Sequence, residues 1–321
     1  MNDVASPGRP RILQVGRLMP SLEAALAENF NLRPLWREAD ADAYLAAHGA
    51  EFTGLVTSLW GPVDAALLAR LPKLRVIAHF GVGYDALDVA AIRARGIPFS
   101  NTPDVLTDCT ADLAWAALLD VARGVSAAER FVRRGAWASG GKFPLQTRVS
   151  GKRLGILGLG RIGRAIARRG AGFGMRVAYH SRHPQAGADY AWHATPAALA
   201  AHSDFFVIAA AGGPQTRGLV SREVIAALPP QAYLVNIARG SVVDEAALVE
   251  ALVEKRIAGA ALDVFEHEPH VPEALLALDN VVLLPHIGSA TRETRQAMAD
   301  LTLANLQAFF RDGQLLTPVE A

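Results

Sequence analysis

The segment 153–167, RLGILGLGRIGRAIA, limits what this chain can fold into more than any other stretch. An apolar run at 154–157 is followed by a G-x-G-x-x-G pattern at 158–163, and apolar residues then recur at helical spacing. In a dinucleotide site the first glycine allows a tight turn, the second lets the backbone approach a pyrophosphate, and the third lets helix and strand pack closely. Because the pattern lies between a predicted strand and a predicted helix, it indicates a nucleotide-binding turn. A purely structural strand–helix turn is the alternative.

The composition is that of an ordinary globular chain. Its 321 residues predict about two domains, and 51% of them are hydrophobic and 20% charged. A net charge of +1 gives no indication of a nucleic-acid partner. No run of about 18 apolar residues and no signal-peptide pattern occurs, so no membrane span is expected. The single cysteine, Cys109, excludes an intrachain disulfide, so we expect a cytoplasmic protein with a packed, unreactive thiol.

Short apolar runs alternate with helical patterns along the chain, which predicts βαβ units and parallel sheets. The predicted strands are 12–15, 54–58, 75–79, 97–100, 154–157, 176–179, 205–210, 232–237, 258–264 and 281–284.

Arg239, Glu268 and His286 each follow one of these strands, and such folds place their chemistry at the carboxyl ends of parallel strands. Hydride transfer to a 2-oxo acid needs a cation for the carboxylate, a donor that polarises the carbonyl, and a proton for the developing alkoxide. A histidine beside an acid can supply the proton, and an arginine can serve as the cation. Taken singly, residues of these types in loops more often have a structural role or a solvated surface position than a catalytic role.

The residues after the glycine turn predict the coenzyme. In an NAD site an acidic residue about 20 residues further on binds the ribose 2′-hydroxyl. This chain has no Asp or Glu between Gly163 and Asp189, and Ser181 and Arg182 lie where the acid is expected. A hydroxyl and a guanidinium suit a 2′-phosphate, so we predict NADPH in preference to NADH. A solvated surface arginine is the alternative.

Two loops in the first hundred residues also follow predicted strands. Gly81 and Gly83 permit backbone amides to point at an anion, although an ordinary turn has the same composition. In the other loop, Leu59 and Trp60 are candidates for a substrate pocket, and for Trp60 core packing is an equal alternative.

Six longer motifs extend over most of the chain. They are HFGVGYDALD at 79–88, NTPDVLTDCTADLA at 101–114, GLGRIG at 158–163, NIARGSVVDEAAL at 236–248, GAALDVFEHEP at 259–269 and LLPHIGSAT at 283–291. Together they resemble the D-isomer-specific 2-hydroxyacid dehydrogenase family. The resemblance covers about 11–318 and implies an α/β fold of two doubly wound parallel-sheet domains with a cleft between them. It implies a flavodoxin-like substrate-binding domain of 1–101 plus 291–321 and a Rossmann cofactor domain of 102–290. Members of the family are usually homodimers.

The resemblance also implies a role for each matching residue. Arg239 corresponds to the arginine that binds the substrate carboxylate, Glu268 to the acid that keeps the histidine protonated, and His286 to the proton donor. The expected substrate contacts are Leu59, Trp60, Arg239 and the backbone amides of Val82 and Gly83. The expected coenzyme contacts are Gly158, Gly160, Arg161, Ile162, Gly163, Ser181, Arg182, Thr107, Ala238 and Asp263. No metal is expected.

Within this family, segment 179–182 resembles that of NADPH-preferring glyoxylate/hydroxypyruvate reductases and of plant-type hydroxyphenylpyruvate reductases. We therefore expect NADPH-dependent reduction of a small 2-oxo acid, glyoxylate or hydroxypyruvate, to the D-2-hydroxy acid. The alternatives are a hydroxyphenylpyruvate reductase, an NAD-dependent dehydrogenase of a D-2-hydroxy acid or of phosphite, and a nucleotide-sensing binding protein without catalysis.

Overall fold

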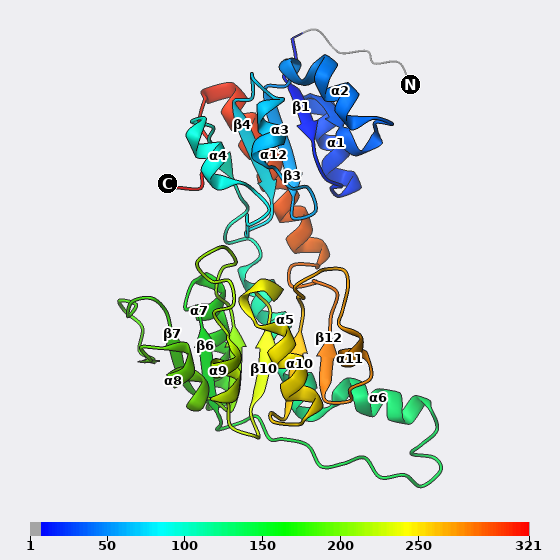
Figure 1. The fold of residues 1–321 in the computed structure, drawn as a ribbon, viewed down its shortest axis with the longest axis vertical. Helices are drawn as coiled ribbons and strands as arrows, with labels where there is room; N and C mark the ends of the chain where they lie inside the picture. Colours follow the sequence, from blue (N-terminus) through cyan, green and yellow to red (C-terminus); the bar gives the residue numbers. More distant parts are fainter. Residues whose placement is uncertain (1–7, 321) are drawn as a thin grey trace. The chain divides into compact units, whose positions relative to one another are not determined.

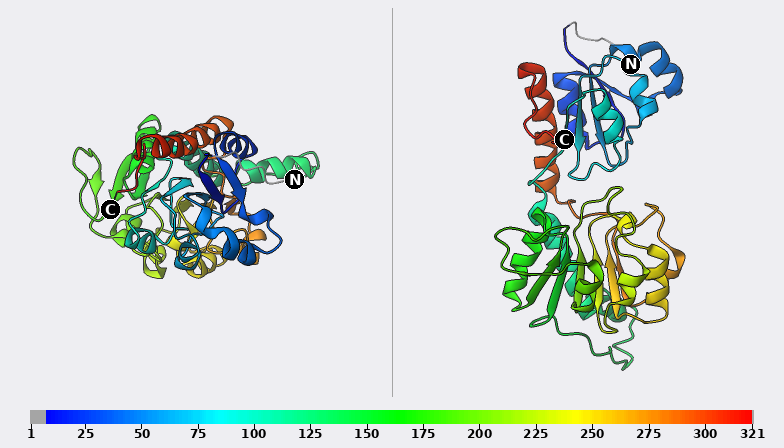
Figure 2. Two further views of the ribbon diagram at one scale, coloured as in Figure 1. Left: turned by 90° about the horizontal axis from the view of Figure 1, so that it is seen from above. Right: turned by 60° about the vertical axis from the view of Figure 1, so that its left-hand side comes forward.

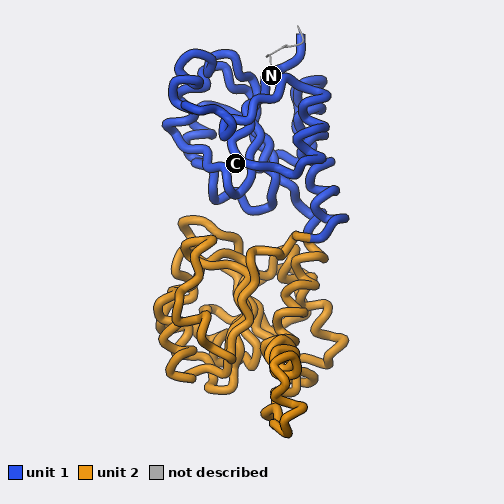
Figure 3. The backbone as a smooth tube through the Cα atoms, turned by 90° about the vertical axis from the view of Figure 1, so that its right-hand side faces the viewer, with its two compact units in different colours: residues 1–106, 291–321 blue, residues 107–290 orange. Residues whose placement is uncertain are grey.

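The computed structural model describes residues 8–320, which form two compact units. One unit runs to residue 106 and resumes at 291, and the other comprises 107–290 (Figure 3). Each unit contains one sheet with parallel strand pairing, so the predicted α/β class with two parallel sheets is confirmed. Within the described residues, no helix combines the length and the apolar character needed to cross a membrane.

The first unit is a five-stranded sheet with helices packed on it. Its strands are β1 (Arg11–Gln14), β2 (Asn31–Pro34), β3 (Gly54–Ser58), β4 (Val76–Phe80) and β5 (Phe99–Ser100). Its helices are α1 (Pro20–Asn29), α2 (Ala41–His48), α3 (Ala65–Ala69), α4 (Val89–Ala94) and α12 (Arg292–Asp312). The strand order β2-β1-β3-β4-β5 is flavodoxin-like. The helix α12 packs against β4 and α1 (Figure 1), so the last part of the chain completes this unit.

The second unit is a seven-stranded sheet. Its strands are β6 (Arg153–Leu157), β7 (Arg176–His180), β8 (Ala191–Trp192), β9 (Phe205–Ile208), β10 (Tyr233–Asn236), β11 (Gly259–Leu262) and β12 (Val281–Leu283). Its helices are α5 (Thr107–Arg123), α6 (Val125–Arg133), α7 (Arg161–Gly172), α8 (Pro196–Ala201), α9 (Arg222–Ala226), α10 (Glu245–Val253) and α11 (Glu273–Leu276). The order β12-β11-β10-β9-β6-β7-β8 contains the Rossmann arrangement, in which strand order reverses between β6 and β9.

Two apolar cores cover the two faces of this second sheet. One joins α8, α9 and α10 through Leu199, Val224 and Leu248, and the other joins α5 and α7 through Trp115 and Ile166. Figure 2 shows helices on both sides of the sheet. Because both faces are buried, strands such as β9 appear in the sequence as continuous apolar runs rather than alternating ones.

The predicted strands end within two residues of the observed ones, but β2 and β8 are not predicted from the sequence. The strand β2, with the sequence NLRP, is half-buried and has no apolar run. The strand β8 consists of two exposed residues. Both lie at a sheet edge, where backbone pairing alone can recruit a segment that lacks a hydrophobic pattern.

The glycine turn lies at the reversal point of the second sheet, directly after β6. Gly158 has a φ of 97°, and a Cβ there would lie 2.7 Å from the Cα atom of Ala210, just beyond β9. A Cβ on Gly163 would lie 2.0 Å from the carbonyl oxygen of Gly158. Glycine at 158 and 163 therefore lets the first turn of α7 pack directly on the end of β6.

We expect Gly163→Ala to lower the free energy of unfolding by about 1–3 kcal/mol, the usual cost of forcing an atom into a packed site. Gly172→Ala is the matched control in the same helix, because nothing lies within 4 Å of a Cβ at that position. The control should leave the melting temperature unchanged or slightly raised. Thermal unfolding followed by circular dichroism measures both variants, and equal shifts would contradict the packing role of Gly163.

Candidate active site

The three candidate catalytic residues follow three neighbouring strands. The strands β10, β11 and β12 are adjacent and parallel, so their carboxyl ends share one edge of the sheet. Arg239 lies three residues beyond the end of β10, Glu268 follows β11, and His286 follows β12. The topology therefore assembles on one edge three side chains that are far apart in the sequence.

His286 and Glu268 form a direct pair. The Nδ1 atom of His286 lies 2.7 Å from Oε2 of Glu268, and the other carboxylate oxygen accepts a bond of 3.1 Å from the backbone N–H of Phe265. Their side chains are 23% and 14% exposed, so both are shielded but reachable from solvent. With Nδ1 donating to the carboxylate, Nε2 on the other side of the ring is the atom that can deliver a proton to a substrate.

The backbone that carries His286 is held by Asp263, the residue after β11. His286 has a φ of 54°, in the left-handed region that non-glycine residues rarely adopt. Its N–H donates to the carbonyl oxygen of Asp263 at 2.9 Å. The next two amides, of Ile287 and Gly288, donate to the two carboxylate oxygens of Asp263 at 2.8 Å each. Asp263 therefore fixes three consecutive amides of the loop that presents the histidine.

The Asp263 carboxyl is only 2% exposed, and burial raises its pKa above the ordinary value, while the two N–H donors and His286 act in the opposite direction. The resemblance predicts a coenzyme contact for this residue, and that contact stays a prediction. Its role in holding the His286 loop is not evident in the sequence, because it depends on contacts across about 25 residues of chain.

Arg239 lies on a loop that is fixed from both sides. The Asn236 side chain accepts from the N–H of Ala238 and donates to the carbonyl oxygen of Arg239, both at 3.0 Å. A Cβ on Gly240 would lie 1.9 Å from the carbonyl carbon of Phe265, so this loop presses directly on the loop that leads to Glu268. The guanidinium donates from Nη1 to the carbonyl oxygen of Ala238 at 2.7 Å. Asn236 is a positioning residue that the sequence does not reveal.

The candidate coenzyme residues gather around the carboxyl ends of β6 and β7. Gly160 is the N-cap of α7, and Arg161 and Ile162 begin the helix, so backbone N–H groups are available for an anion. Beyond β7, the Ser181 hydroxyl donates to the carbonyl oxygen of His183 at 2.6 Å. Arg182 donates from Nη1 to Oε1 of Gln215 at 3.0 Å. Without an acidic residue between 164 and 188, this edge fits a dinucleotide that carries an additional phosphate.

Two other predicted coenzyme residues have defined places in the second unit. Thr107 is the first residue of α5, and Ala238 is buried in the loop before Arg239. Cys109, in the first turn of α5, is half-buried and forms no disulfide.

In the first unit, three backbone carbonyl groups of the loop after β4 have hydrogen-bond partners. Gly81 O accepts from the N–H of Thr102 at 2.9 Å, Val82 O from the side chain of Asn101 at 2.8 Å, and Gly83 O lies 2.8 Å from Nε2 of His79. Because a trans peptide directs its N–H opposite to its C=O, these bonds fix where the N–H groups of residues 82–84 point. Backbone N–H groups with fixed directions are suited to an anion, and their contact with the substrate stays a prediction.

Leu59 is half-buried in the loop after β3, and Trp60 is 58% exposed. Core packing, one of the two alternatives for Trp60, is therefore excluded.

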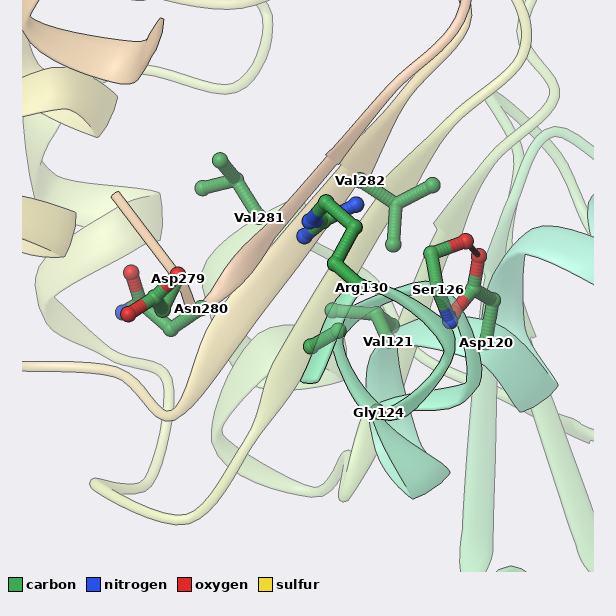
Figure 4. A pocket seen from close by; sticks show the side chains of 10 residues that line it. Asp120, Val121, Gly124, Ser126, Arg130, Asp279, Asn280, Val281 and Val282 are labelled. Atoms are coloured by element: carbon green, nitrogen blue, oxygen red, sulfur yellow. Dashed lines mark hydrogen bonds between the residues drawn. The ribbon is translucent and has the colours of Figure 1, made fainter. Parts of the chain in front are cut away.

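Figure 4 shows a pocket in the second unit that none of the candidate catalytic residues lines. It is lined by Asp120, Val121, Gly124, Ser126, Ala127, Arg130, Asp279, Asn280, Val281 and Val282. Val281 begins β12, whereas His286 follows the other end of that strand. The pocket therefore lies at the amino edge of the sheet and contains none of the predicted site residues.

The chain is similar to known dehydrogenases and reductases over nearly its whole length. Residues 115–288 match the model of the D-isomer specific 2-hydroxyacid dehydrogenase, NAD binding domain. A hydroxyphenylpyruvate reductase of Plectranthus scutellarioides is 45% identical over 308 residues, covering 96% of this chain and 98% of that protein. A glyoxylate/hydroxypyruvate reductase of Arabidopsis thaliana is 44% identical over 308 residues, with coverage of 96% and 98%. The crystal structure of an NADPH-dependent glyoxylate/hydroxypyruvate reductase from Sinorhizobium meliloti, in complex with NADP and malonate, has a TM-score of 0.92 at 46% identity and 97% coverage of each chain.

Proposed function

This chain belongs to the D-isomer-specific 2-hydroxyacid dehydrogenase family, and from that premise we propose that it reduces glyoxylate or hydroxypyruvate with NADPH. The product is the D-2-hydroxy acid. The observation that carries the proposal is the 2.7 Å contact between His286 Nδ1 and Glu268 Oε2, at the same sheet edge as Arg239. Two relatives named as reductases of these acids support the choice of substrate.

NADPH supplies the hydride when it is bound, and the chain's own residues supply the rest of the chemistry. Arg239 binds the substrate carboxylate and polarises the neighbouring carbonyl group. His286 gives the proton on Nε2 to the carbonyl oxygen as that oxygen becomes an alkoxide, which leaves an alcohol. Glu268 accepts from Nδ1 and so holds the ring with Nε2 available for the transfer. The N–H groups of residues 82–84 are further proposed donors to a carboxylate.

The choice of NADPH rests on the residues beyond β7. Arg182 is exposed at the carboxyl end of that strand, and the sequence from 164 to 188 contains no acidic residue that would repel a 2′-phosphate. A guanidinium presents several donors in a plane, which suits phosphate oxygens. The Sinorhizobium meliloti relative is described as NADPH-dependent and was crystallised with NADP, which supports the same choice here.

Hydroxyphenylpyruvate is the second candidate substrate, because the Plectranthus scutellarioides relative acts on it by name. The exposed ring of Trp60 offers an aromatic surface for such a substrate. Rates of NADPH oxidation with glyoxylate, hydroxypyruvate and 4-hydroxyphenylpyruvate separate the candidates. Absence of turnover with every 2-oxo acid, despite NADPH binding, would instead favour a nucleotide-sensing protein.

Arg182→Ala is expected to raise the KM for NADPH about tenfold or more and to change the KM for NADH about twofold at most, because the proposed partner of the guanidinium is the 2′-phosphate, which NADH lacks. Arg176→Ala is the matched control, since Arg176 is exposed at the opposite end of the same strand. Steady-state kinetics with both coenzymes measures the effect. An equal loss with NADPH and NADH would contradict the 2′-phosphate role.

His286→Gln is expected to lower kcat by about 10²–10⁴-fold, the usual contribution of a positioned general acid. The dissociation constant of NADPH should stay unchanged, because the histidine acts on the substrate. His202→Gln, an exposed position after α8, serves as the control. Normal turnover by the His286 variant would remove this residue from the mechanism.

The proposal includes a homodimer that covers α6 and the segment after it. None of the nine residues of α6 is buried. Val125, Val132, Trp137 and Leu145 are all more than half exposed, which leaves an apolar surface of the kind that a partner subunit covers. Sedimentation equilibrium should give twice the chain mass of 34.1 kDa, and Val132→Asp should shift the protein toward monomer. A wild-type monomer at micromolar concentration would contradict this part.

A further inference from the structure

Arg182 forms a hydrogen bond with a residue of a different loop. Its Nη1 atom donates to Oε1 of Gln215 at 3.0 Å, and the two residues are 33 positions apart in the sequence. Arg182 follows β7, whereas Gln215 lies in the loop after β9. Both side chains are exposed, so this bond contributes little to the stability of the fold and acts mainly on the position of the guanidinium.

The bond crosses the part of the sheet edge where the glycine turn lies. In the sheet, β6 lies between β9 and β7, so the loops that carry Gln215 and Arg182 flank the turn that follows β6. The close approach of Gly158 to Ala210 shows that the loops after β6 and β9 are in direct contact. At this reversal point a Rossmann sheet binds the phosphates and the adenosine ribose of its dinucleotide. The Arg182–Gln215 pair therefore stands at the ribose side of the predicted coenzyme site.

Both partners are carried on ordered backbone. In the loop after β9, Thr216 donates from its hydroxyl to Ala211 O at 2.6 Å and from its N–H to Gly213 O at 3.1 Å, which closes the loop around Gln215. On the other side, the indole of Trp192 donates to the carbonyl oxygen of Ser181 at 3.1 Å. These bonds hold the two loops so that the Gln215 amide lies against the Arg182 guanidinium.

We propose that Gln215 is a second specificity-determining residue for the coenzyme, which positions Arg182 for a 2′-phosphate without cancelling its charge. This inference rests on the proposed NADPH-dependent function. The amide oxygen is a neutral acceptor, so Arg182 keeps a full positive charge for the phosphate. Its NH₂ group adds donors beside the guanidinium. A carboxylate at this position would pair with Arg182 as an ion and would repel a doubly charged phosphate.

Gln215→Glu tests the inference, because it keeps the length and acceptor of the side chain and changes its charge. We expect the dissociation constant of NADPH, measured by isothermal titration calorimetry, to rise about tenfold, because the carboxylate both neutralises Arg182 and repels the phosphate. The dissociation constant of NADH should stay unchanged, so the ratio of the NADPH constant to the NADH constant should rise about tenfold. Gln231→Glu carries the same charge change at the amino end of β10, on the opposite edge of the sheet, and should shift this ratio less than about twofold.

The outcomes separate the inference from the function on which it rests. If the wild-type protein binds NADPH more tightly than NADH and Gln215→Glu leaves the ratio unchanged, the role of Gln215 is wrong while the proposed coenzyme stands. If the wild-type protein shows no preference for NADPH, the coenzyme proposal itself fails. In the Arg182→Ala background, Gln215→Glu should shift the ratio of the NADPH and NADH dissociation constants less than it does in the wild type. Without the guanidinium, only the direct repulsion between the new carboxylate and the phosphate remains. An undiminished shift there would overturn the positioning role.

Discussion

The parallel pairing of β10, β11 and β12 brings three separate segments of the chain to one edge of a sheet, and the candidate chemistry depends on it. The registers place Asn236 beside Leu262, and Leu262 beside Leu283, so the residues that follow these strands are neighbours. From this alignment Glu268 reaches His286, and the loop that carries Arg239 packs on the loop that carries Glu268. A slip of one residue in either pairing would turn the buried side chains of the slipped strand to the opposite face of the sheet and would displace the residues that follow it.

Holding the His286 loop with a buried Asp263 carboxylate lowers the stability of the fold. A non-glycine residue in the left-handed region costs about 1–3 kcal/mol, and a buried carboxylate carries a further desolvation penalty, which is visible in its raised pKa. Hydrogen bonds from Ile287 and Gly288 offset part of that penalty. These bonds fix the backbone of His286 although the buried carboxylate is unfavourable for folding. Such a loss of stability is expected at a site whose function depends on the position of one side chain.

The sequence predicts what depends on local pattern and misses what depends on contacts between loops. The strand β3 and the glycine turn are predicted because apolar runs and glycine spacing are local signals. The positions of Glu268 and His286 follow from motifs at strand ends. By contrast, Asn236 and Asp263 fix the loops of Arg239 and His286 through hydrogen bonds from backbone amides. These bonds exist only in the folded sheet. No residue type or spacing in one chain identifies such bonds in advance.

The helix α7 links the glycine turn to the choice of coenzyme through electrostatics. Asp40, Asp64, Asp88 and Asp244 cap the N-termini of α2, α3, α4 and α10 with side-chain hydrogen bonds. The helix α7 instead begins at Gly160 without a side-chain cap, has no acid in its first turn, and starts with an arginine. Positive charge at a helix N-terminus is unfavourable unless an anion lies against it. Arg161 at the start of α7 and Arg182 beyond β7 place two arginines at this end of the sheet, which favours a ligand with phosphates at both places.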